Sequence, residues 1–257
     1  MARDRNFVLL SAILFTASAA ITVRWCGSMS GGMNMPGGWT MSMAWMKMPG
    51  QSFLAAAAAF VGMWAVMMVA MMLPSLVPEL LRYRHWQLVG DRFTLDWLTT
   101  VAAAGYFLVW ILIGTAVYPL GVACARTEMH SPTLARAVPF LSAMALLLAA
   151  GFQFTSWKSR SLCLCRGESL QNSLDSPSCR AAWSHGIHLG LNCALCCTGL
   201  MLALLVVGVM NVPAMAAITL GITFERLAPR PKLLARVIAM VFAVAGVWEV
   251  SHFIANS

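Results

Sequence analysis

The sequence has few charged residues. Asp, Glu, Lys and Arg make up 10% of its 257 residues, whereas a soluble domain carries about 25%. Hydrophobic residues account for 60% of the chain, and the mean hydropathy is +0.76. This composition excludes an ordinary soluble domain and predicts a chain embedded in a lipid bilayer.

Several functional motifs are missing from the sequence. It carries no nucleotide-binding or P-type ATPase motif, so we expect any movement of an ion to be passive or driven by a partner. It has no haem-attachment motif either. We find no convincing internal repeat, which argues against a transporter built from inverted halves.

Long apolar runs predict an all-α, polytopic transmembrane bundle of about seven helices in a single domain, residues 1–257. A crossing helix needs about 20 mostly apolar residues, and helices satisfy their backbone polar groups within lipid. The first run resembles a secretory signal, but we expect it to stay as an anchor. The predicted helices cover residues 7–23, 52–80, 96–119, 134–156, 184–209, a short 212–227, and 236–254.

The basic residues predict the orientation of this bundle. Thirteen of the 17 Lys and Arg residues fall in segments that would face the cytosol if the N-terminus is inside and the C-terminus is periplasmic. The segment 24–51 is then an outer loop and 157–183 a cytosolic loop. This distribution explains the net charge of +8 without nucleic acid, so we expect a multi-pass protein of the bacterial inner membrane whose main partner is the bilayer.

Methionine is concentrated in one region, residues 29–72, which holds twelve of the 19 methionines. Met63, Met67 and Met71 are spaced by four, so they share one face of a helix, with Met68 and Met72 beside them. Thioethers are soft ligands that suit Cu(I). Methionine is also a flexible filler of apolar cores, and this packing alternative stays open for the stripe.

The outer loop carries a second methionine group. A Gly-rich segment has little core to fill, so packing explains these residues less well. We predict that the loop binds Cu(I) weakly through many equivalent ligand sets. Its methionines are Met29, Met33, Met35, Met41, Met43, Met46 and Met48.

The predicted helix 184–209 carries three cysteines within five positions. Cys193, Cys197 and Met201 step by four along one face, and Cys196 lies on the neighbouring face with His185, His188 and Asn192. Polar groups within a membrane normally face the bundle interior. We therefore predict metal ligation by Cys193, Cys196, Cys197 and Met201, with His188 as the nitrogen ligand or an exit-side station. The alternative is that the cysteines merely pack as small residues.

The axial rise of a helix places Cys196 and Met63 at similar depths. If the helix 52–80 packs on 184–209, its methionines would complete a shared site that prefers Cu(I) to harder ions.

The remaining polar residues allow several interpretations. Glu225 could pair with Arg226 or Lys232. Glu249 and His252 are three residues apart and share one face of a predicted helix. They could form an ion pair at the membrane interface, an outer metal site or a proton relay. Cys26 and Cys124 lie near the predicted outer face, where a disulfide would persist. The cytosolic cysteines could bind a soft metal or be spare thiols; they are Cys163, Cys165 and Cys179.

Scattered short motifs resemble a bacterial family of predicted metal-binding integral membrane proteins. The resemblance implies a helical membrane architecture and metal binding. The family has a wider Cys-Leu-x-x-Cys spacing where this chain has Cys163-Leu-Cys165. The matching pieces are Met63-Trp64 through Met71-Met72-Leu73-Pro74-Ser75, Phe152-Gln153-Phe154-Thr155 with Lys158, Cys193-x-x-Cys196-Cys197 through Met201, Met210-Asn211, and Glu225 followed by Pro229.

These features favour copper(I) capture, delivery or transport, by a binding protein rather than an enzyme. A periplasmic metal chaperone or a partner membrane subunit would then exchange copper with it. One alternative is an accessory or structural subunit of a larger membrane complex. The other is a membrane thiol–disulfide oxidoreductase, which a mid-membrane cysteine without a nearby cation would serve poorly, because a reactive thiolate needs stabilisation and access.

Overall fold

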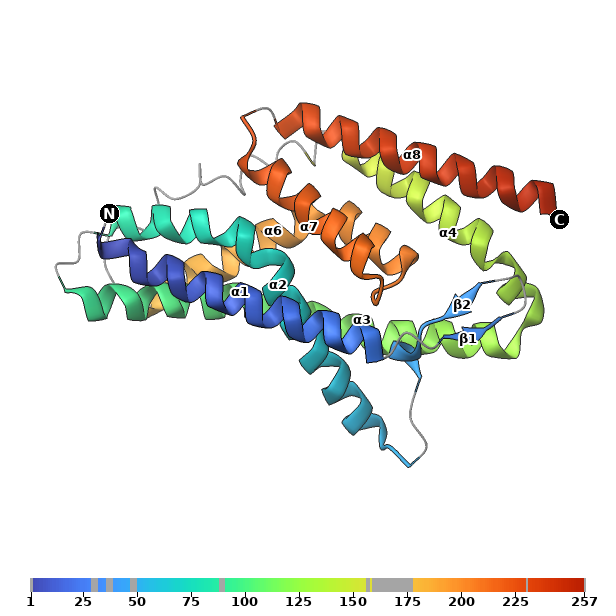
Figure 1. The fold of residues 1–257 in the computed structure, drawn as a ribbon, viewed down its shortest axis with the longest axis horizontal. Coiled ribbons are helices and arrows are strands. Elements are labelled where there is room, and N and C mark those ends of the chain that lie inside the picture. The colour runs from blue at the N-terminus through green and yellow to red at the C-terminus, as the bar shows by residue number, and fades with distance from the viewer. Residues whose placement is uncertain are drawn as a thin grey trace.

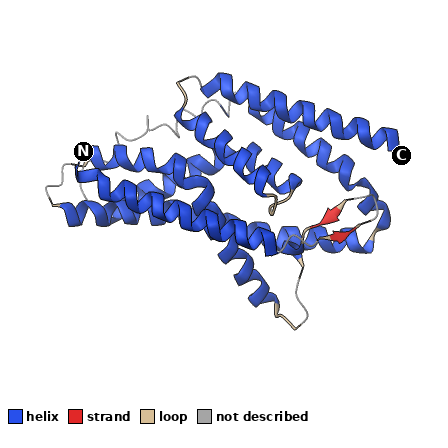
Figure 2. Cartoon of the chain, in the orientation of Figure 1, coloured by secondary structure: helices blue, strands red, loops and turns tan. Residues whose placement is uncertain are grey.

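The protein is all-α, as the sequence predicts (Figures 1 and 2). The structure is a computed structural model that describes residues 2–28, 32–35, 39–46, 50–87, 91–155, 158, 178–229 and 231–256. These residues form seven α-helices, one short 3-10 helix (Met43–Trp45) and one short antiparallel hairpin. The elements are α1 Ala2–Ser28, β1 Met33–Asn34, β2 Thr40–Met41, α2 Phe53–Trp86, α3 Arg92–His130, α4 Pro132–Gln153, α6 Cys179–Val207, α7 Val212–Leu227 and α8 Pro231–Asn256.

Six of these helices are long and apolar enough to cross a membrane: α1, α2, α3, α4, α6 and α8. The seventh, α7, has 16 residues and a length of about 24 Å, which falls short of the roughly 30 Å hydrocarbon core. The two termini lie at opposite ends of the molecule (Figure 1), and the number of crossings stays a prediction. Which end faces the cytosol remains a prediction.

Several helices extend beyond the apolar runs that predict them. Ser52, Asp91 and Ser178 cap α2, α3 and α6 by accepting a hydrogen bond from a backbone N–H in the first turn. α3 continues for 39 residues and ends at His130, before the Ser131-Pro132 pair. Cys124 and Glu128, which the sequence predicts in a loop between the helices 96–119 and 134–156, therefore lie within α3. Hydropathy identifies only the apolar part of a helix and misses its polar end.

The helix α2 contains Pro74 and Pro78 and continues through both to Trp86. It bends along its length (Figure 1), as expected where proline removes a backbone donor and crowds the preceding turn. Prolines at these positions predict either a kink or an end of the helix, and the structure has the bend.

The centre of the bundle is built around the parallel pair α3 and α6. A side chain at Gly186 would collide with the Ala102 carbonyl, and one at Gly105 with the Trp183 carbonyl, so glycine allows the two backbones to approach. α2 packs mainly on α1, α3 and α7, while α6 packs mainly on α3, α4 and α7. α3 and α7 thus pack against both α2 and α6, and α2 and α6 also touch directly where the rings of Tyr83 and His185 stack.

Candidate metal centre

The methionine stripe of α2 faces the protein interior. Met63, Met67 and Met71 are 7%, 2% and 2% exposed, and Met68 and Met72 are wholly buried. All five belong to the same core cluster as the cysteines of α6. Their sulfur atoms are therefore enclosed by protein and not directed to lipid.

The three cysteines of α6, Cys193, Cys196 and Cys197, are wholly buried, and none of them is in a disulfide. The sulfur atoms of Cys193 and Cys197 are 3.7 Å apart, since residues four apart lie on the same helical face. Met201, the next residue on that face, is 7% exposed. The structure thus assembles two thiols and a thioether along one buried face.

Cys193 is a meeting point of four helices. The Tyr106 hydroxyl of α3 donates to the Cys193 sulfur at 3.0 Å. Arg226 Nη1 of α7 donates to the same sulfur at 3.4 Å and to Ser75 Oγ of α2 at 3.1 Å. The expectation that no cation lies near these cysteines is therefore wrong: Arg226 is 2% exposed and touches the thiol.

Two contacts fix the register of α2 against α6, which run antiparallel. Arg226 links Ser75 to Cys193, and the rings of Tyr83 and His185 stack with centroids 4.9 Å apart. Because the two helices are antiparallel, four residues before Ser75 on α2 correspond to four residues after Cys193 on α6. Met71 therefore lies level with Cys197. This register places Met71, two helical turns further along α2 than Met63, beside the cysteines, while the bilayer depths expected for Cys196 and Met63 stay a prediction.

A buried ion pair lies beside Cys196. Lys158 Nζ is 2.7 Å from Glu225 Oε2 and also donates to the Cys196 carbonyl. Gln153 Nε2 donates to Glu225 Oε1 at 3.2 Å. Glu225 thus pairs with Lys158 and not with Arg226 or Lys232, since both Lys158 and Glu225 are 1% exposed and turn toward each other inside the bundle.

The predicted nitrogen ligand lies outside this cluster. His188 is exposed, and its neighbour His185 stacks on Tyr83. The outer disulfide is also absent: Cys26 and Cys124 are free, and the Cys26 thiol donates to Met210 Sδ at 3.8 Å. An exposed His188 does not join the buried thiols as a ligand in this structure, and its role as an exit-side station stays a prediction.

The outer methionine loop is partly folded onto the bundle. Met33 pairs with Met41 across the β1–β2 hairpin, and Trp39 Nε1 donates to the Ala135 carbonyl of α4 at 2.9 Å. Met41 is 2% exposed while Met33 is 43% exposed, so these positions are not equivalent. Met35 and Met46 are half-buried, whereas Met29, Met48, Cys163, Cys165 and the side chain of Met43 lie outside the described residues.

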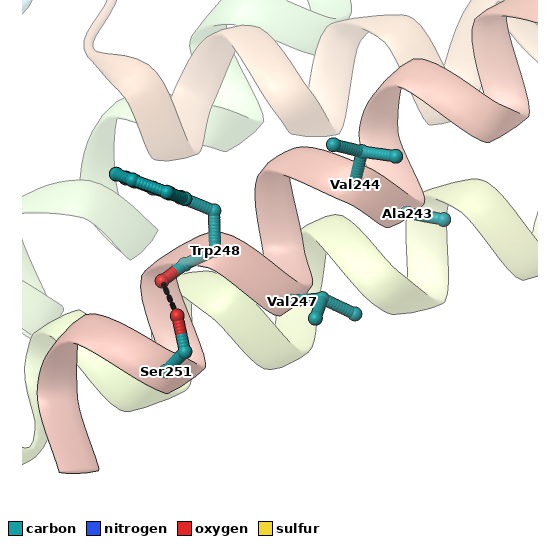
Figure 3. A pocket seen from close by; sticks show the side chains of 5 residues that line it. All are labelled: Ala243, Val244, Val247, Trp248 and Ser251. Atoms are coloured by element: carbon teal, nitrogen blue, oxygen red, sulfur yellow. Dashed lines mark hydrogen bonds between the residues drawn. The ribbon is translucent and has the colours of Figure 1, made fainter. Parts of the chain in front are cut away.

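The ligand set of the cluster depends on sulfur. Within the described ranges, no group of three or more His, Cys, Asp or Glu side chains is placed to hold a metal ion. A shallow depression of about 360 Å³ on α8 is lined by Ala243, Val244, Val247, Trp248 and Ser251, and it offers no soft ligand (Figure 3). Methionine and cysteine sulfurs together make the α2–α6 cluster the stronger candidate.

The sequence model of the PpoB2 family, described as a copper chaperone, matches residues 61–249. The chain belongs to this copper chaperone family. A search of curated proteins and a search of solved structures found no match. The matched range includes the methionine stripe, the three buried thiols, Lys158 and Arg226. The sequence similarity to the family therefore covers the sulfur-rich core.

Sequence reasoning missed Tyr106, Ser75 and the buried placement of Arg226. A tyrosine inside an apolar run was a usable signal, because polar groups in a membrane usually face the bundle interior. Arg226 was counted as a loop cation because it ends its apolar run. Its reach back into the core depends on the packing of α7 between α2 and α6, which spacing along one helix does not reveal.

Proposed function

We propose that the protein is a membrane copper chaperone that holds Cu(I) between Cys193 and Cys197 of α6 and Met71 of α2. The observation that carries this proposal is the pair of buried thiols with sulfurs 3.7 Å apart, level with a buried thioether. Met201 and Met72, which are also buried, are further ligands for an ion that moves along the cluster.

The geometry of the two thiols suits a shared soft ion. Thiolate–metal bonds are about 2.3 Å long for zinc, so two sulfurs on one tetrahedral ion lie about 3.8 Å apart. Thiolate and thioether ligands favour Cu(I) over harder ions. Because the ligating cysteines must lose their protons, binding at this dry site releases protons.

The polar neighbours position the thiols. Tyr106 and Arg226 direct donors at the Cys193 sulfur, and Lys158 holds the Cys196 carbonyl while paired with Glu225. A metal ion needs an electron pair of the Cys193 sulfur, so these donors shift when copper binds. Release reverses this exchange, and the protein needs no nucleotide for it.

Metal analysis of purified protein tests this proposal. The double variant Cys193→Ser/Cys197→Ser, purified from copper-supplemented cells, should lose most of the copper found in the unmodified protein. Cys179→Ser is the matched control, because Cys179 is an exposed thiol at the opposite end of α6, and it should retain the copper. Equal copper content in the double variant and the control would refute the buried site.

Thiol–disulfide chemistry is a second candidate, favoured by Arg226 beside Cys193. Oxidation of Cys193 and Cys197 would form one S–S bond and release two protons and two electrons to an acceptor. Trapping the free thiols by alkylation in cells, followed by mass spectrometry, separates the two functions. A Cys193–Cys197 disulfide would favour redox chemistry, and two thiols that are alkylated only after a chelator has removed the copper would favour copper binding.

A further inference from the structure

A second sulfur-bearing site lies where α6 ends. A cavity of about 730 Å³ opens between the hairpin segment, the C-terminal half of α3, the first half of α4, the last turn of α6 and α8. Its chemistry-bearing lining residues are Met41, Cys124, Glu128 and Glu249, and residues 205–208 at the end of α6 also line it. We call this cavity the α6-end pocket.

The lining of the α6-end pocket suits a soft cation. The Cys124 thiol is exposed and can be reached from the cavity, and Met41 supplies a thioether. Glu128 lies one turn from Cys124 on α3, and Glu249 approaches from α8, so two carboxylates attract positive charge. The last turn of a helix adds the negative end of its dipole and its unpaired carbonyl groups.

The pocket adjoins the buried cluster along one helix face. Leu205 lines the pocket, Met201 lies one turn back, and Cys197 lies two turns back, about 12 Å away along the axis. Met201 and Cys197 are both buried. The sulfur atoms of Met201 and Cys197 therefore follow one another along the helix face that leads from the pocket to the thiols proposed to hold copper.

We propose that the α6-end pocket is a second Cu(I) site, formed by the sulfurs of Cys124 and Met41, at which copper passes between an external carrier and the buried cluster. This inference rests on the proposed function. Two sulfurs leave open positions on the ion, which the donating or accepting carrier fills. The site is therefore weaker and faster to exchange than the buried one.

The test measures protection of Cys124 from a maleimide by Cu(I) buffered with a bicinchoninate competitor. Peptide mass spectrometry reports labelling at each cysteine. Cu(I) should slow labelling of Cys124 severalfold while leaving Cys179, an exposed thiol outside the pocket, unchanged. Met41→Leu and Glu128→Gln should each reduce this protection. Met33→Leu is the matched control, since Met33 pairs with Met41 across the hairpin but does not line the pocket.

A variant that lacks the buried thiols separates this inference from the proposed function. In Cys193→Ser/Cys196→Ser/Cys197→Ser, Cu(I) should still protect Cys124. Equal protection of Cys124 and Cys179, or protection that Met41→Leu and Glu128→Gln leave unchanged, would overturn the second site. Unchanged copper content in the triple variant would instead refute the buried site, whatever happens at Cys124.

Discussion

Lys158 and Glu225 carry opposite charges that are each 1% exposed and 2.7 Å apart. An ion pair in a dry core contributes little net stability, but removal of one partner leaves an uncompensated charge. Gln153 and the Cys196 carbonyl share the same network. We therefore infer that the ion pair mainly holds the backbone of α6 in place at Cys196, and that it adds little to the net stability of the fold.

We expect Lys158→Met to destabilise the protein by about 3–5 kcal/mol, because Glu225 would stay buried without its cation. The double variant Lys158→Met/Glu225→Gln removes both charges and should recover most of the loss. Thermal unfolding in detergent measures both. If the double variant melted no higher than Lys158→Met, pairing would not be the reason for the loss.

Part of the site can be read from spacing along a single helix. Cys193, Cys197 and Met201 share a face at intervals of four, and the structure buries all three. The contacts of Cys193 with Tyr106 and Arg226 could not be predicted in this way. They join residues 87 and 33 positions apart, so they depend on which helices are neighbours.

The helices α3 and α6 approach closely through glycine. Gly186 lies against the backbone of Ala102, and Gly105 against the backbone of Trp183. This crossing sets the position of Tyr106, which is one residue from Gly105 and donates to Cys193. A small residue at the crossing therefore controls the geometry of the thiol cluster.

We expect Gly186→Leu to separate α3 from α6, which would lower both the melting temperature in detergent and the copper content. Gly151→Leu is the matched control, since a side chain at Gly151 of α4 meets no neighbouring atom within 4 Å. This control should behave like the unmodified protein. Equal losses in both variants would show that leucine is harmful at any helical glycine, and the crossing would lose its special role.

The helices themselves could be predicted from apolar runs, and their neighbours could not. The range predicted for α7, 212–227, agrees with Val212–Leu227. The predicted α2 ended near residue 80, whereas the helix continues to Trp86, because Tyr83 and Arg84 are buried against other helices. Hydropathy measures affinity for lipid, so it underestimates the length of a helix whose polar end is stabilised by contacts with other helices.

At the scale of the whole molecule, the outer surface suits lipid. Leu10 and Ile13 of α1 are 66% and 64% exposed, and Val244 of α8 is 70% exposed. The count of basic residues that predicts the orientation becomes smaller when buried residues are left out. Arg84, Lys158 and Arg226 are buried, which leaves ten basic residues on the predicted cytosolic side against four outside. The bias keeps its direction, and the N-terminus is still expected to be inside.

Reporter fusions test this orientation and also whether α7 crosses the membrane. Fusion at Asp91, between α2 and α3, should give cytosolic fluorescence, and fusion at the C-terminus should give periplasmic phosphatase activity. A fusion after Gly208, before α7, and another after Ala228, after α7, should report opposite sides if α7 crosses. The short α7 can do so where Arg226 turns back into the core and the bilayer thins around it. Fluorescence from the C-terminal fusion, or the same side reported before and after α7, would contradict seven crossings.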